Sequence, residues 1–154
     1  MQKIINNIKN IAKNYTAKSK WSHDWEHTLR VHNIAMHIWK IENADMEILE
    51  IATYLHDIAR HKQDESNWVI CHAEYWAYMA ETILIDLWIE KNKNIKILHC
   101  IKSHRSRWNN IPKTIEAKIL FDADKLDSIW AVWIWRAFLF AWEIWAKLHN
   151  KDVD

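Results

Sequence analysis

The sequence predicts an all-α protein with a single-domain helical bundle. Apolar residues recur at helical spacing along most of the chain, and no stretch shows the alternation of a half-buried strand. No repeat and no low-complexity linker divides it. A chain of 154 residues, half of them hydrophobic, is long enough for one domain with its own core. We therefore expect one domain over residues 1–154.

Helical periodicity begins at the N-terminus. Residues 2–18 place isoleucines on one face of an amphipathic helix. Residues 24–40 form a second expected helix, for which Asp24 provides the N-cap. His27 shares the apolar stripe of this helix, so its imidazole is expected to face the interior.

The third expected helix ends in an unusual pair of side chains. It follows a cap within residues 43–45 and runs through apolar positions to His56 and Asp57. Burying an imidazole and a carboxylate without partners is costly, and pairing or metal coordination is the usual remedy. For this dipeptide alone, a histidine satisfied by the neighbouring carboxylate is the simpler explanation.

The same periodicity predicts the remaining helices and places more polar residues on them. They are residues 69–87 with His72 in the first turn, a helix capped by Asn94 that carries His104, residues 114–127 with Asp124, and a last stretch towards Leu148.

Metal-ligand residue types therefore lie on several helices that share one core. Side chains from facing helices of a bundle converge on its interior, where such folds build metal sites. Mixed imidazole and carboxylate ligands suit Mn, Fe, Zn or Mg. Such an ion binds phosphate oxygens and acidifies a water molecule, as phosphoester hydrolysis requires. The candidates at inward or helix-end positions are His27, His56, Asp57 and Asp124, followed by His72 and His104.

Five segments resemble the HD-domain metal-dependent phosphohydrolase superfamily, over about residues 22–148. They are HTLRV (27–31), LHDIAR (55–60), CHAE (71–74), SHR (103–105) and TIEAKILFDADKLD (114–127). The resemblance implies an HD-type bundle in which one divalent metal is held by His27, His56, Asp57 and Asp124. It selects Asp124 rather than Asp122, because the ligand aspartate of the family precedes a basic residue.

The chemistry of the side chains suggests their roles. Asp57 is the expected proton acceptor for the attacking water. Lys125 and Arg60, which lie next to ligands, are expected to offset the charge of a phosphate. His72 and His104 either hold a second metal ion or contact the phosphate, and both alternatives stay open.

Two arginines refine this assignment. Arg30 lies three residues after His27, and we expect it to hold a carboxylate structurally. Some members of the family have an acid three residues after the HD aspartate, where this chain has Arg60. That departure disfavours a deoxyribonucleoside monophosphatase.

The predicted function is that of a small cytoplasmic phosphohydrolase that acts on a nucleotide. The stand-alone family members that it resembles hydrolyse nucleotides, some of them releasing pyrophosphate from nucleoside triphosphates. The alternatives are another small phosphoester, such as a nucleoside monophosphate or an alarmone-type nucleotide, and a metal- or nucleotide-binding module without turnover. Homodimerisation is one open assembly state.

Charge and composition exclude other classes of function. The net charge of +1 provides no basic footprint for nucleic acid, and no apolar run is long enough to span a membrane. Two cysteines without a disulfide framework, and an N-terminus without a signal peptide, favour the cytoplasm.

The tryptophan and glycine contents are abnormal. The chain has 12 Trp and no Gly, whereas about 11 glycines would be usual. Trp39 and Trp88 follow apolar helices where a glycine C-cap is expected, and Trp108 lies in a polar turn. We hypothesise that most of these positions, Trp25 excepted, are Gly in the working protein, through a codon that genetic codes read differently. The resembled family has Gly at many of them. Deliberate recoding and a truly Trp-rich chain are the alternatives.

Overall fold

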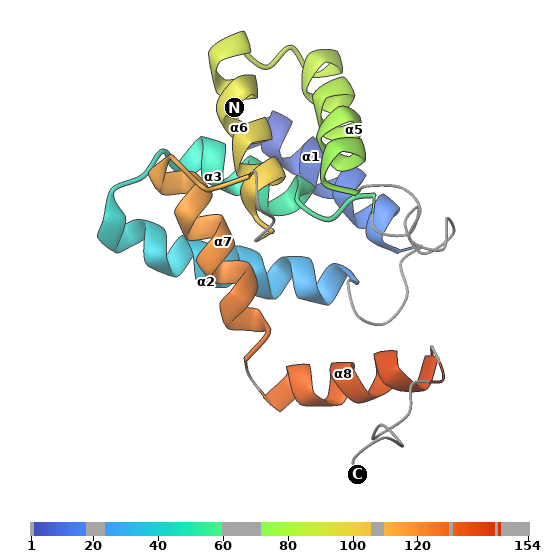
Figure 1. Ribbon diagram of the computed structural model, residues 1–154. Helices are drawn as coiled ribbons and strands as arrows, with labels where there is room; N and C mark the ends of the chain where they lie inside the picture. Colours follow the sequence, from blue (N-terminus) through green and yellow to red (C-terminus); the bar gives the residue numbers. More distant parts are fainter. Residues whose placement is uncertain are drawn as a thin grey trace.

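The computed structural model describes residues 2–17, 24–59, 72–105, 110–129, 131–143 and 145. Within these ranges the chain forms seven helices and no strand, which confirms the all-α prediction (Figure 1). The helices are α1 (Gln2–Thr16), α2 (Trp25–Glu42), α3 (Met46–Leu55), α5 (His72–Asp86), α6 (Lys91–Ser103), α7 (Ile115–Asp127) and α8 (Ala131–Glu143).

Short polar side chains start three of these helices. Asp24 caps α2 by accepting a hydrogen bond from the backbone amide of His27 at 2.9 Å. Asp45 caps α3 in the same way, and Thr114 caps α7 through the amide of Ala117 at 3.3 Å. Each cap satisfies an amide that has no partner within its helix.

Two predicted helix ends are wrong. α6 begins at Lys91, so Asn94 lies inside the helix and is buried instead of capping it. α2 continues past Trp39 to Glu42, and Asn43 takes the left-handed C-cap position with φ 52°. Asparagine tolerates this conformation and can end the helix at Asn43. The helix is therefore most of a turn longer than one that ends before Trp39.

α3 forms the centre of the bundle. Seven of its ten residues are buried, and it packs against α1, α2, α6 and α7. α2 also packs along α7, and α5 along α6. A helix that is apolar on nearly every side has to be enclosed by other helices. The C-terminal end of α3 therefore carries His56 and Asp57 into the interior.

α8 lies at the edge of the bundle, beyond the end of α7 (Figure 1). Among the helices of the described residues, none is both long and apolar enough to cross a membrane. Several large apolar side chains of α8 are nevertheless exposed, namely Ile134, Trp135, Phe138, Leu139 and Trp142.

Two tryptophans adopt a backbone conformation that glycine favours. Trp88 has φ 56° and Trp145 has φ 54°. The left-handed region costs a residue with a Cβ atom about 1–2 kcal/mol. Trp88 is 93% exposed, so little packing offsets this cost. The angles support the hypothesis that these two positions are Gly in the working protein, whereas Trp108 lies outside the described residues.

Candidate metal centre

α2 brings His27 into the interior within its first turn. The side chain is 2% exposed, and its Nδ1 lies 2.7 Å from Oδ2 of Asp127 on α7. A carboxylate only accepts hydrogen bonds, so Nδ1 carries the hydrogen of the neutral ring. The lone pair on Nε2 then faces the centre of the bundle.

The end of α3 supplies a second imidazole and a carboxylate. His56 is fully buried, and its Nδ1 donates a hydrogen bond to the carbonyl oxygen of Thr53 at 2.7 Å. This bond again leaves Nε2 with the lone pair. Oδ2 of Asp57 lies 3.5 Å from Nε2 of His27 and 3.7 Å from Nε2 of His56.

His104, just after α6, faces the same carboxylate from the other side. Its Nδ1 donates to the carbonyl oxygen of Ile101 at 2.5 Å, and the ring of Trp76 stacks on it. Its Nε2 is buried, has no hydrogen-bond partner in the described part of the chain, and lies 3.7 Å from Oδ1 of Asp57. Asp57 thus presents one oxygen to His27 and the other to His104.

α7 contributes Asp124 rather than Asp122. Asp124 is buried, with Oδ1 3.5 Å from Nε2 of His27, whereas Asp122 is exposed. The other oxygen of Asp124 accepts a hydrogen bond from Nζ of Lys125 at 3.0 Å. Lys125 itself is 45% exposed, so its ammonium group lies at the margin of the centre.

These side chains fit a divalent metal ion. Ligand atoms of His27, His56 and Asp124 lie within 4.8 Å of one another, and the Nε2 atoms of the two histidines are 3.4 Å apart. Two lone pairs at this distance repel unless a proton or a cation lies between them. The donors are imidazole nitrogens and carboxylate oxygens, which suit Mn, Fe or Zn. Asp57 lies beside this set, close to both imidazoles.

The pKa values of His27 and Asp124 also indicate that the centre favours a positive charge. Burial lowers the pKa of His27, but hydrogen bonds with Asp124, Asp127 and Asp57 outweigh burial and raise it to about 10. Burial raises the pKa of Asp124, yet its hydrogen bond with His27 holds that pKa well below the usual range. For His56 burial dominates, and its pKa is lowered. A metal cation would supply the charge that the proton on His27 otherwise provides.

Two other predicted site residues lie outside the described structure. Arg60 falls in a range that the structure does not describe. His72 is the first residue of α5, but its side chain is outside the described part. The roles of both residues stay predictions.

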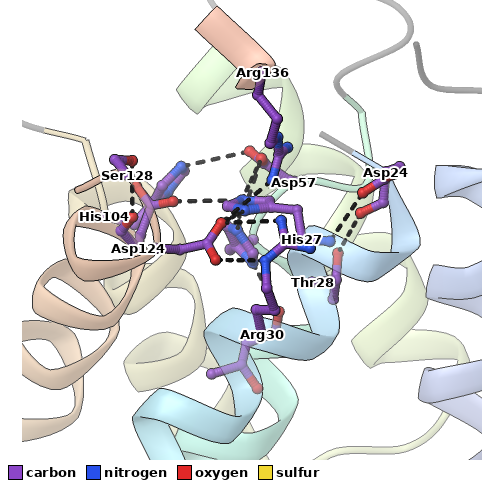
Figure 2. A network of polar contacts seen from close by, with 12 residues as sticks. Asp24, His27, Thr28, Arg30, Asp57, His104, Asp124, Ser128 and Arg136 are labelled. Atoms are coloured by element: carbon purple, nitrogen blue, oxygen red, sulfur yellow. Dashed lines mark hydrogen bonds and ion pairs between the residues drawn. The ribbon is translucent and has the colours of Figure 1, made fainter. Parts of the chain in front are cut away.

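Two residues of the centre were missed at the sequence level, Asp127 and Arg136. Arg30, expected to hold a carboxylate, binds Asp127. Arg136 on α8 donates to the same carboxylate. In the view of Figure 2 the labelled Arg30 and Arg136 lie on opposite sides of His27. The spacing of Asp127, three residues after Asp124, could have placed it on the same side of α7. No local signal marks Arg136.

The comparison with family models decides the family. The model of the HD domain matches residues 24–129. The chain is a member of the HD domain family. The bundle and its buried His and Asp residues agree with this membership.

Relatives of this HD domain are known from Bacillus subtilis and other bacteria. The chain is 33% identical to the uncharacterized protein YpgQ of Bacillus subtilis over 136 residues, which cover 86% of the chain and 62% of YpgQ. The chain thus spans less than two thirds of the length of that relative.

Solved structures show the same fold. The crystal structure of YpgQ in complex with ADP matches with a TM-score of 0.75 and 30% identity, over 98% of this chain and 72% of that one. A protein described as a predicted HD superfamily hydrolase, from an uncultured Thermotogales bacterium, matches with a TM-score of 0.70 and 33% identity. That match covers 91% of this chain and 75% of the other.

Proposed function

We propose that this HD domain is a divalent-metal-dependent phosphohydrolase that acts on nucleotides and releases pyrophosphate from nucleoside triphosphates. The observation that carries the proposal is the set of inward-facing Nε2 atoms of His27 and His56 beside Asp57 and Asp124. The complex of YpgQ with ADP supports a nucleotide as the substrate class.

Each polar side chain of the centre has a role in this reaction. A divalent ion held by His27, His56, Asp57 and Asp124 would bind phosphate oxygens and acidify a water molecule. Asp57 would accept a proton from the attacking water, because its buried carboxylate lies among the proposed ligands.

Positive side chains at the margin offset the charge of the phosphate groups. Nζ of Lys125 pairs with Asp124 and stays partly exposed. It can therefore bind a phosphate while it keeps its contact with Asp124. We assign the same role to Arg60, which follows the HD dipeptide closely in sequence.

A second divalent ion on the far side of Asp57 is a subsidiary proposal. Oδ1 of Asp57 lies 3.7 Å from the buried Nε2 of His104. In the neutral ring both atoms are hydrogen-bond acceptors, so a cation, or a proton carried by a phosphate, would be favoured between them. Direct contact of His104 with the phosphate is the alternative. Metal analysis of the purified protein separates the two, since a second ion raises the ratio of metal to protein above one.

The test of the function is product identification. The protein is incubated with Mn²⁺ and a panel of nucleoside mono-, di- and triphosphates, with the Asp57→Ala variant as the inactive control. Pyrophosphate from triphosphates supports the proposal, and orthophosphate from monophosphates favours a nucleotidase instead. Absence of any release by folded, metal-loaded protein contradicts hydrolysis of nucleotides, and nucleotide binding without turnover identifies a binding module.

A further inference from the structure

We propose that Asp127 is a positioning residue, which orients His27 for metal binding and is itself held by Arg30 and Arg136. This inference rests on the metal centre proposed above. Asp127 comes from the end of α7, Arg30 from α2 and Arg136 from α8. The three residues, with His27, join the helices around one side of the centre.

The contacts of Asp127 involve both of its oxygens. Oδ2 lies 2.7 Å from Nδ1 of His27, and Oδ1 accepts a hydrogen bond from Nε of Arg30 at 2.6 Å. Oδ2 also accepts from Nη2 of Arg30 and from Nη1 of Arg136, each at 3.3 Å. The carboxylate is 5% exposed. Three donating side chains therefore determine its position.

Asp127 contacts the side of the His27 ring that is turned away from the other candidate ligands. Nε2 points to His56, Asp57 and Asp124, while Nδ1 points to Asp127. Asp127 is accordingly not a ligand of the same ion. Its hydrogen bond selects the tautomer with the hydrogen on Nδ1 and prevents the ring from turning over, as carboxylates behind metal-binding histidines commonly do.

The two arginines keep this carboxylate in place. A buried carboxylate is costly to desolvate, and two guanidinium groups supply compensating charge. Hydrogen bonds of Arg30 to both oxygens also fix the plane of the carboxylate. Arg30, Arg136 and Asp127 thus form a clamp on the Nδ1 side of His27.

The experiment compares Mn²⁺ binding by metal-free protein, measured calorimetrically, for wild type, Asp127→Asn and Asp122→Asn. Asp127→Asn keeps the size of the side chain but removes its negative charge. It also leaves only one oxygen that can accept hydrogen bonds. We expect it to weaken Mn²⁺ binding about 10–100-fold. Asp122→Asn, on the exposed side of the same helix, should bind Mn²⁺ as wild type does.

Each outcome has one meaning. Failure of wild type to bind Mn²⁺ contradicts the proposed metal centre itself. Unchanged affinity in folded Asp127→Asn, with binding by wild type, overturns the positioning role alone. Where Asp127→Asn does not fold, Arg30→Met replaces it, because Arg30 is partly exposed and Arg136 still holds the carboxylate. Weaker Mn²⁺ binding by folded Arg30→Met supports the clamp, and wild-type affinity overturns it.

Discussion

Within the described part of this HD domain, three buried histidines are oriented in the same way. His27 donates its Nδ1 hydrogen to a carboxylate, while His56 and His104 donate theirs to carbonyl oxygens one turn earlier in the chain. In the neutral form of each ring this bond leaves the lone pair on Nε2, and each Nε2 lies within 3.7 Å of an oxygen of Asp57. Backbone carbonyls at the ends of α3 and α6 thus orient two imidazoles without any further side chain.

Asp57 is the residue whose change should affect catalysis most directly. Asp57→Asn keeps the shape of the side chain but cannot accept a proton, so we expect kcat to fall by about 10²–10⁴-fold. Steady-state rates with Mn²⁺ and the best nucleotide of the panel test this, with Asp122→Asn as the control. Wild-type kcat in Asp57→Asn would assign the base to another group.

Cys100 should be chemically inert in the folded protein. Burial raises the pKa of its thiol to about 12, so almost none of the reactive thiolate forms at mildly alkaline pH. We expect iodoacetamide to leave the Cys100 peptide unmodified under native conditions and to alkylate it fully in denaturant, as measured by peptide mass mapping. Rapid native alkylation would show that α6 opens readily.

At the scale of the helix, the C-terminal end of α5 shows a mismatch between residue and conformation. The amide of Ile89 donates to the carbonyl oxygen of Leu84, and Trp88 between them has φ 56°. This is the bonding pattern of a helix end that favours Gly. Asn43 occupies the equivalent conformation after α2, where its side chain suits it better.

Replacing Trp88 separates the effect of the backbone from that of the indole. Trp88→Gly and Trp88→Ala both remove an exposed ring, but only alanine keeps a Cβ atom in the left-handed region. We expect Trp88→Gly to exceed Trp88→Ala in free energy of unfolding by about 1 kcal/mol, or about 2–4 °C in Tm. Equal stability in denaturant titrations would remove the conformational argument for Gly at this position.

The helices were predictable from the sequence, but not all of their ends. Asp24 and Asp45 are caps as expected, because a short polar side chain before an apolar run is a local signal. Asn94 is also a residue type that caps helices, but it lies one turn inside α6. Its role depends on burial against the rest of the bundle, which a local pattern does not contain.

At the scale of the whole molecule, the grouping of His27, His56 and Asp124 has a different origin. Periodicity placed His27 on an inward face and His56 at the end of a helix, and the resemblance to HD proteins suggested that they meet with Asp124. Arg136 was not predictable, because its contact with Asp127 depends on where α8 lies relative to the end of α7. Such an arrangement of helices is set by tertiary packing, which spacing in the sequence does not determine.

Metal binding should stabilise the whole bundle, since the proposed ligands come from α2, the end of α3, and α7. Mn²⁺ at about 100 times its Kd would add about 2.7 kcal/mol to the free energy of unfolding, or about 5–10 °C in Tm. Thermal unfolding with and without Mn²⁺ measures this shift. EDTA should reverse it, and Asp124→Asn should lose most of it. An equal shift in Asp124→Asn would place the ion elsewhere.

The pairing of His27 with Asp127 joins residues that are 100 positions apart in sequence. A contact of this length carries a larger loop-closure entropy than the local contacts of a helix, which slows its formation. During synthesis, α2 and α3 leave the ribosome long before α7 does. The nascent chain therefore cannot complete the proposed metal centre until α7 has been translated, so the ion would bind only after α2, α3 and α7 are all present.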